Sequence, residues 1–271
     1  MKRYVAACSF GKDSMATVIL AKKFKEPLDE VVYCEVMFDK ETSGEVPEHR
    51  DFIYSVAIPF LEKAGVPVRI VRSEKNFIER FQHRVGRNGV WAGKMWSWPL
   101  CGRCYVQRDL KVRPMDAWKR ANWSGDEIVQ YVGIADDETD RLVRMDSYKH
   151  PAVSLLEKYG VTEEAALALC RKHGLLSPIY EFAPRNGCFF CPNAKERELR
   201  HLYDHHPDLW GRLLELQALP EKATELFTRE LRFDEIDAAF RMDDAQFDLL
   251  SEKEPIPYTY ERICRNALQT P

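Results

Sequence analysis

Short apolar runs alternate with helical patterns over the first half of this 271-residue chain. The four runs are rich in β-branched residues and lie at 4–7, 31–38, 66–71 and 128–134. Helical patterns separate them, at 15–24, 49–64 and 109–121. Short apolar runs that alternate with helices predict parallel strands whose two faces are both covered. We therefore expect an α/β fold built on a twisted parallel sheet with helices on both faces.

The segment Cys-Ser-Phe-Gly-Lys-Asp-Ser at 8–14 joins the first predicted strand to the first predicted helix. Gly11 allows the backbone to approach an anion, Lys12 supplies a positive charge, and a serine can cap a helix whose free N–H groups point at the ligand. We predict a phosphate-binding turn, with a purely structural serine-capped turn as the alternative. The segment is not a Walker motif, because Ala6 and Asp13 stand where that motif needs a glycine and a Ser or Thr.

The composition is that of an ordinary globular protein, since 45% of the residues are hydrophobic and can form a substantial core. No apolar run reaches membrane-spanning length, and the charged loop comes too early for a signal peptide. We expect a cytoplasmic protein with no membrane partner. The net charge is −3, but segment 69–120 holds 13 Lys and Arg against four Asp and Glu. Such a segment suits either an anionic partner or a solvated helix face.

The pattern becomes mainly helical after residue 150. Helices are predicted at 152–159, 163–173, 194–204, 208–219 and 221–240. Thr162 is the expected N-cap of the second of these helices, and Gly174 is its stop signal. The expected division is therefore a nucleotide-binding domain over residues 1–150 and a helical region over 151–271, which contains the second of two cysteine pairs.

Two Cys-x-x-Cys pairs stand out among the eight cysteines. They comprise Cys101, Cys104, Cys188 and Cys191. This spacing lets two thiolates reach one metal, and two pairs complete a four-thiolate set that ties the sheet domain to the helical region. Soft thiolates select zinc or an iron–sulfur cluster, and the spacing does not discriminate between them. The alternatives are independent buried cysteines or a redox disulfide. The remaining cysteines, Cys8, Cys34, Cys170 and Cys264, are expected to be small core residues.

Five segments in order resemble the PP-loop ATP pyrophosphatases and the phosphoadenosine phosphosulfate (PAPS) reductase-like family over about residues 3–195. The segments are Ser-Phe-Gly-Lys-Asp-Ser at 9–14, Thr-Ser-Gly-Glu-Val-Pro-Glu at 42–48, Trp-Pro-Leu-Cys-Gly-Arg-Cys at 98–104 with Leu-Lys-Val at 110–112, Gly-Ile-Ala-Asp-Asp-Glu-Thr-Asp-Arg at 133–141, and Ser-Pro-Ile-Tyr at 177–180 with Gly-Cys-Phe-Phe-Cys-Pro at 187–192. The resemblance implies an adenine nucleotide alpha hydrolase-like fold. It implies that the first loop binds the phosphates of ATP, that backbone near the second strand's end binds the adenine, and that Arg141 contacts the nucleotide or an anionic substrate. It also favours a 4Fe-4S cluster over structural Zn²⁺ at the paired cysteines.

Polar residues at the ends of predicted strands offer further contacts. Asp39 can accept hydrogen bonds from ribose hydroxyls or cap its own loop. The acidic turn 136–138 can hold Mg²⁺, which stabilises a departing pyrophosphate, or can simply be solvated. Lys111 and Arg103 are expected to contact an anion. The predicted nucleotide-binding residues are Ser9, Gly11, Lys12, Asp13, Ser14, Asp39, Gly133 and Glu138, and the predicted catalytic residues are Lys12, Asp13 and Arg141.

The resemblance and the intact lysine-bearing loop favour an ATP-dependent, adenylylating sulfur-transfer enzyme. A substrate oxygen attacks the α-phosphate, pyrophosphate leaves, and sulfide or a persulfide displaces AMP. The expected partners are an adenine nucleotide, a sulfur donor and an acceptor that is a nucleic acid or a small molecule. The sequence assigns neither that acceptor nor the oligomeric state.

Two other functions remain open. A thiol-dependent reductase of PAPS or adenylyl sulfate is one, but the glycine that follows the catalytic cysteine in such enzymes is absent after Cys264. The other is a non-catalytic, zinc-stapled module that binds a nucleotide or a nucleic acid. Trp91, Trp96 and Trp98 within the basic segment support it, because aromatic side chains can stack on bases, although tryptophans at such spacing also form cores.

Overall fold

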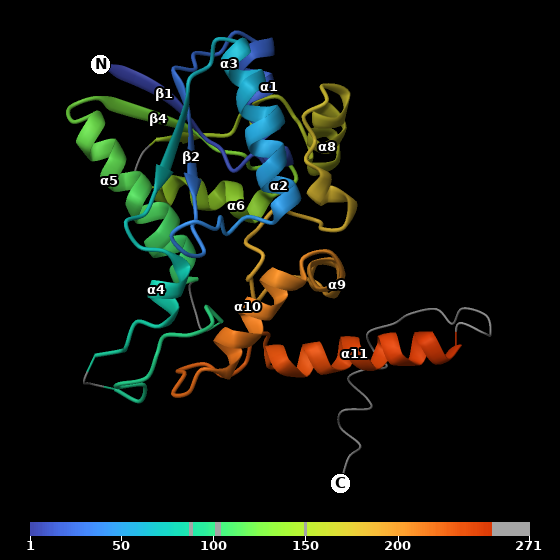
Figure 1. The fold of residues 1–271 in the computed structure, drawn as a ribbon. Coiled ribbons are helices and arrows are strands. Elements are labelled where there is room, and N and C mark those ends of the chain that lie inside the picture. Colours follow the sequence, from blue (N-terminus) through green and yellow to red (C-terminus); the bar gives the residue numbers. More distant parts are fainter. Residues whose placement is uncertain (87–88, 101–103, 149–150, 251–271) are drawn as a thin grey trace. The chain divides into compact units, whose positions relative to one another are not determined.

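The computed structural model describes residues 1–86, 89–100, 104–148 and 151–250 (Figure 1). The chain forms two compact units. The first comprises Met1–Glu79 and Tyr105–Cys188, and the second comprises Arg80–Cys104 and Phe189–Pro271. The first unit therefore continues past residue 150, where the sequence analysis places its boundary. The first two helices that follow residue 150, at Leu155–Lys158 and Glu163–Lys172, pack on the first helix of the chain.

A five-stranded sheet, with every neighbouring pair of strands parallel, forms the centre of the first unit, in the order β3-β2-β1-β4-β5. The strands are β1 (Lys2–Ala7), β2 (Glu30–Glu35), β3 (Val68–Arg72), β4 (Glu127–Tyr131) and β5 (Ala152–Val153). The α/β class and the four predicted strands are confirmed. The helix predicted from residue 152 is wrong at its start, because Ala152 and Val153 pair with Gln130 and Tyr131 of β4. Two residues are too few to show a strand period.

Helices cover both faces of this sheet. In the first half of the chain they are α1 (Lys12–Lys23), α2 (Pro47–Phe52), the π-helical turn η1 (Ile53–Ala57), α3 (Ile58–Lys63), α4 (Phe77–Phe81), the π-helical segment η2 (Val106–Val112) and α5 (Arg113–Asn122). The following ones are α6 (Thr139–Val143), η3 (Arg144–Ser147), α7 (Leu155–Lys158), α8 (Glu163–Lys172) and η4 (Pro178–Glu181). Helices α1, α3 and α8 lie on one side of the sheet and α5 on the other (Figure 1).

The buried side chains of the first unit form a core on each face of the sheet. The larger one lies under α1, α3 and α8, and it includes Cys8 and Cys170. The smaller one lies under α5 and includes Cys34. These three cysteines are therefore small core residues, as predicted, whereas Cys264 lies outside the described residues. Thr162 caps α8 by accepting a hydrogen bond from the Ala165 N–H, which confirms the predicted start of that helix.

The second unit is built from α9 (Glu196–His205), α10 (Pro207–Ala218) and α11 (Phe233–Leu250). Trp98 is 1% exposed, and its indole N–H donates to Gln217 Oε1 at 2.9 Å. Trp98 is thus a core residue and does not present a face for stacking on bases. Among the described parts of the chain, no helix is both long enough and apolar enough to cross a membrane.

The helix predicted over 221–240 is wrong in its first half, because α11 begins only at Phe233. Glu221 adopts a left-handed backbone conformation with φ 54°, which interrupts a helix. The backbone of Glu221 and Ala223 bonds to Met95 instead. Met95 N donates to the Glu221 carbonyl, and Ala223 N donates to the Met95 carbonyl. Tertiary pairing therefore overrides the local helical pattern here.

Candidate functional site

A cavity of about 750 Å³ opens at the carboxyl ends of the central strands β1 and β4. This edge of a parallel sheet is where α/β proteins bind their ligands. Eight of the predicted site residues line the cavity, namely Ser9, Gly11, Lys12, Asp13, Ser14, Gly133, Glu138 and Arg141. The fold therefore brings together two segments that lie more than 100 residues apart in the sequence.

The side chains of Asn186 and Tyr180 pack closely against Gly11 in the loop before α1. A Cβ atom on Gly11 would lie 2.6 Å from Asn186 Oδ1 and 3.0 Å from the Tyr180 hydroxyl oxygen. The prediction that a serine caps α1 is wrong, because Gly11 is the N-cap residue and no side chain bonds there as a cap. Ser14 Oγ donates to the Gly11 carbonyl instead. The Tyr180 hydroxyl accepts a hydrogen bond from the Lys12 N–H at 2.7 Å.

Gly133 allows the end of β4 to touch the first turn of α1. A Cβ atom at this position would lie 2.6 Å from Ser14 N and 2.7 Å from the Asp13 carbonyl carbon. Both atoms belong to the backbone of a helix and cannot move aside independently. Glycine is therefore required at residue 133 by the close approach of the two elements.

Lys12 projects into the cavity and is only 8% exposed. Its Nζ donates to the two carboxylate oxygens of Asp13 at 2.8 and 3.0 Å and to Glu163 Oε1 at 2.7 Å. Burial alone would lower the pKa of Lys12, but the two carboxylates outweigh it and the pKa is raised. The ammonium group therefore keeps its positive charge at neutral pH.

Three carboxylates meet beside Lys12, from Asp13, Glu138 and Glu163. One oxygen of each lies within 4.8 Å of the others. Burial raises the pKa of Asp13, and the Glu163 and Glu138 charges add to this effect, although Lys12 opposes it. Glu138 also accepts from the Ala135 N–H at 3.0 Å and forms an ion pair with Arg141.

Of the acidic turn predicted to hold a metal, only Glu138 lines the cavity. Asp136 and Asp137 are exposed, and Asp137 Oδ1 accepts from the Glu163 N–H at 3.0 Å, which supports the start of α8. Sequence reasoning missed Glu163. Acidic residues are common in the first turn of a helix because the helix dipole favours negative charge there. The sequence position of Glu163 therefore does not indicate a functional site.

The far side of the loop rests on His49, which is fully buried at 0% exposure. Its Nε2 lies 3.0 Å from the Ser9 carbonyl and its Nδ1 lies 2.9 Å from Ser177 Oγ. A carbonyl oxygen can only accept a hydrogen bond, so the ring proton of His49 is placed on Nε2. Nδ1 then accepts from the Ser177 hydroxyl. Asn186 Nδ2 donates to the same Ser9 carbonyl at 3.1 Å. A segment near residue 180 thus fixes the loop near residue 10.

This buried imidazole makes stability sensitive to acid. Burial lowers the pKa of His49 from its usual 6.5, so below that pH the unfolded chain binds more protons than the folded one. The stabilising contribution of the neutral ring is present above the usual pKa and is lost as the pH falls through the folded-state value. We expect His49→Gln, whose amide can still donate to Ser9, to lose less stability between about pH 8 and pH 5 than the wild type. Thermal unfolding at several pH values measures this difference, and parallel curves for the two proteins would contradict it.

Lys111 reaches the cavity from the π-helical segment η2. Its Nζ lies 3.5 Å from Glu45 Oε1, and the other oxygen of Glu45 is buried without a hydrogen-bond partner. Burial disfavours the charge of Lys111, but the nearby Glu45 carboxylate outweighs it and the pKa of Lys111 is raised. Lys111 is therefore a cation facing the cavity. Arg103, the other predicted anion contact, lies outside the described residues.

Asp39 does not line the cavity. Its Oδ1 accepts from the Glu41 N–H at 2.7 Å and from the Thr42 N–H at 2.6 Å, and its Oδ2 accepts from the Thr42 hydroxyl at 3.2 Å. These bonds correspond to the loop-capping alternative of the sequence analysis.

Cys188 belongs to the first unit, where its backbone forms an antiparallel bridge with Glu45. Cys104 and Cys191 belong to the second unit, and Cys101 lies outside the described residues. The thiols of Cys104, Cys188 and Cys191 are all half-buried. A shared metal site of four cysteines stays a prediction.

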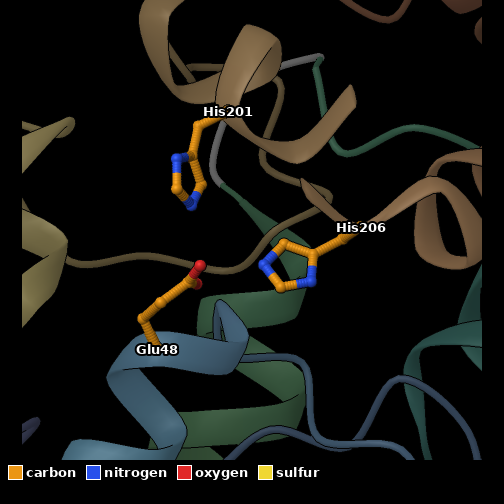
Figure 2. Close-up of side chains that lie close together, drawn as sticks. All are labelled: Glu48, His201 and His206. Carbon is orange, nitrogen blue, oxygen red and sulfur yellow. The ribbon is translucent and has the colours of Figure 1, made fainter. Parts of the chain in front are cut away.

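Histidines gather at the junction of α9 and α10 in the second unit. Figure 2 shows the imidazole rings of His201 and His206, whose centroids lie 5.9 Å apart. The His201 ring also stacks on His205, with centroids 4.3 Å apart.

Comparison with known proteins assigns the chain neither a family nor a function. No model of a known protein family and no curated protein sequence matches the chain. Among solved structures, the chain is similar to the U34-tRNA thiolase NcsA from Methanococcus maripaludis with its 4Fe-4S cluster. The two are 18% identical, the match covers 81% of this chain and 72% of that one, and the TM-score is 0.39. A similarity of this size establishes neither a shared family nor a shared function.

Proposed function

We propose that the chain binds ATP at the loop before α1 and uses it for adenylylating sulfur transfer. The observation that supports this most is the meeting of residues 9–14 with Gly133, Glu138 and Arg141 in one cavity at the carboxyl edge of the sheet. A cavity of this size suits a nucleotide together with a second small substrate group. The cations that line it include Lys12, Lys111 and Arg141, and they suit anionic groups.

The phosphates are proposed to lie at the N-terminus of α1. The dipole of this 12-residue helix and the first-turn N–H groups after that of Lys12, which donates to Tyr180, favour an anion there. Lys12 adds a fixed positive charge in a site that is largely shielded from water, where electrostatic stabilisation is strong. Arg141 orients the nucleotide or the anionic substrate from the fourth strand's loop.

The carboxylates of Asp13, Glu138 and Glu163 fit Mg²⁺. This cation prefers oxygen ligands, and each of the three residues supplies one within 4.8 Å of the others. Bound there, Mg²⁺ would offset the charge of the departing pyrophosphate. Burial is the main cause of the raised pKa of Asp13, and the charges of Glu163 and Glu138 add to it, so a cation held by these carboxylates would favour the ionised form of Asp13.

The reaction is proposed to proceed by two displacements. An acceptor oxygen attacks the α-phosphorus of ATP, the bond from that phosphorus to the bridging oxygen breaks, and pyrophosphate leaves. Sulfide then attacks the carbon that bears the adenylylated oxygen, the C–O bond breaks, and AMP leaves. Adenylylation converts a poor leaving group into a good one. In both steps the residues of this chain bind and orient phosphate oxygens and stabilise their charge.

We also propose that Cys101, Cys104, Cys188 and Cys191 hold a 4Fe-4S cluster, with structural Zn²⁺ as the alternative. Four soft thiolates suit either group. Protein purified without oxygen should be brown and contain iron and acid-labile sulfide, and Cys188→Ser should lose most of both. Cys34→Ser is the matched control, because this buried thiol lies in the first unit and should leave the metal content unchanged. Colourless protein with stoichiometric zinc would select the alternative, and protein without metal would contradict both.

Product analysis with ATP labelled on the α-phosphate tests the proposed reaction. With Mg²⁺, sulfide and an acceptor from each class, namely transfer RNA, DNA and small metabolites, we expect labelled AMP together with pyrophosphate. Sulfite released from adenylyl sulfate or PAPS without ATP would instead identify a reductase. ATP that binds but stays intact with every acceptor would identify a non-catalytic module.

A further inference from the structure

Glu163 holds the lysine of the phosphate loop from a helix 151 residues away in the sequence. Its Oε1 lies 2.7 Å from Lys12 Nζ. Glu163 is the first residue of α8, and its own N–H is fixed by Asp137. The contact lies at the cavity wall, where both residues are part of the lining. An anion that binds Lys12 in this cavity therefore meets the Glu163 carboxylate beside it.

Two carboxylates take up most of the hydrogen-bonding capacity of Lys12 in this arrangement. An ammonium group has three N–H donors. Its contacts are to the two oxygens of Asp13 and to Glu163 Oε1. A phosphate oxygen that approaches Lys12 therefore competes with these carboxylates for its N–H groups.

Glu163 is the carboxylate that is free to withdraw. Its side chain is 52% exposed, whereas that of Asp13 is 22% exposed. A half-exposed glutamate can exchange its contact with Lys12 for contact with water, whereas a more buried carboxylate cannot. Asp13 adjoins Lys12 in the chain and stays beside it on the first turn of α1.

We propose that Glu163 is a positioning residue that makes ATP binding depend on a divalent cation. Without the cation, Glu163 competes with phosphate for Lys12 and adds negative charge beside the polyanion. With Mg²⁺ present, Glu163 turns to the cation together with Asp13 and Glu138, and an N–H of Lys12 becomes available to phosphate. The inference rests on the proposed ATP site, but it concerns only the role of Glu163 within that site.

Calorimetric titration of ATP into the wild type and Glu163→Gln, in EDTA and in Mg²⁺, tests this role without measuring turnover. In EDTA, Glu163→Gln should bind ATP roughly tenfold more tightly than the wild type, which corresponds to about 1.4 kcal/mol. The gain in affinity on adding Mg²⁺ should be smaller in this variant. Glu164→Gln is the matched control, because the next residue of α8 is also an exposed glutamate but does not line the cavity.

A second pair of variants tests whether the effect passes through Lys12. In the Lys12→Ala background, adding Glu163→Gln should raise the affinity in EDTA by much less than tenfold, because no ammonium group remains to be released and only the charge repulsion is relieved. A tenfold gain in that background would overturn the role of Lys12 and leave simple charge repulsion. Equal affinities of the wild type and Glu163→Gln in EDTA would overturn the inference while leaving the ATP site intact. A wild type that binds no ATP with or without Mg²⁺ would instead refute the proposed function.

Discussion

Replacing Lys12 with alanine should weaken ATP binding roughly 100-fold, or by about 2.8 kcal/mol, and abolish pyrophosphate release. The substitution removes a buried cation and leaves three carboxylates beside the place proposed for the phosphates. Both changes act in the same direction, because an attraction is lost and the repulsion of a polyanion grows. Calorimetric titration with ATP and Mg²⁺ measures the loss.

Lys23→Ala provides the control for this experiment. Lys23 is the last residue of the same helix and is exposed, so its removal changes the net charge by the same amount without touching the cavity. We expect its ATP affinity to equal that of the wild type. If Lys12→Ala also binds ATP like the wild type, the phosphates do not lie at this loop.

Gly133→Ala is the second substitution with a large expected effect. The new Cβ would lie within 3 Å of backbone atoms of Asp13 and Ser14, so β4 and α1 must move apart. Overpacking of this kind destabilises a protein by about 1–3 kcal/mol. Because the displaced turn is the one proposed to bind phosphate, ATP affinity should fall together with stability. Denaturant unfolding and ATP titration of the same preparation measure the two effects.

The matched glycine for comparison is Gly211, in the interior of α10. No heavy atom lies within 4 Å of a Cβ built there, and its backbone is helical. Alanine at this position should leave stability unchanged or raise it by up to about 1 kcal/mol. Unchanged stability and unchanged ATP affinity in Gly133→Ala would show that the contact between β4 and α1 is not as close as described.

The sheet was predictable because its signals are local. Each of the first four strands is a short β-branched run, and such runs specify buried parallel strands without reference to distant residues. The features that were missed depend on tertiary contacts. Strand β5 exists because two residues pair with β4, and the late start of α11 follows from the bonds of residues 221 and 223 to Met95.

The candidate site likewise combines a local segment that the sequence predicts with distant contacts that it does not predict. Residues 9–14 were predicted because a phosphate-binding turn depends on its own backbone and adjoining helix. His49, Tyr180, Asn186 and Glu163 were missed, because each reaches the loop from elsewhere in the chain. A buried histidine, a tyrosine after proline, a loop asparagine and a first-turn glutamate all have common structural explanations. Only the folded chain shows that they converge on one loop.

The place of the phosphates can be seen in a crystal structure with the ATP analogue that has a methylene group between its α- and β-phosphates. This analogue cannot be cleaved at the proposed bond and should stay in place. We expect phosphate density at the N-terminus of α1, within hydrogen-bond distance of Lys12 Nζ and of the backbone N–H groups of the first turn. Density for the analogue at another place, with this cavity filled only by solvent, would contradict this expectation.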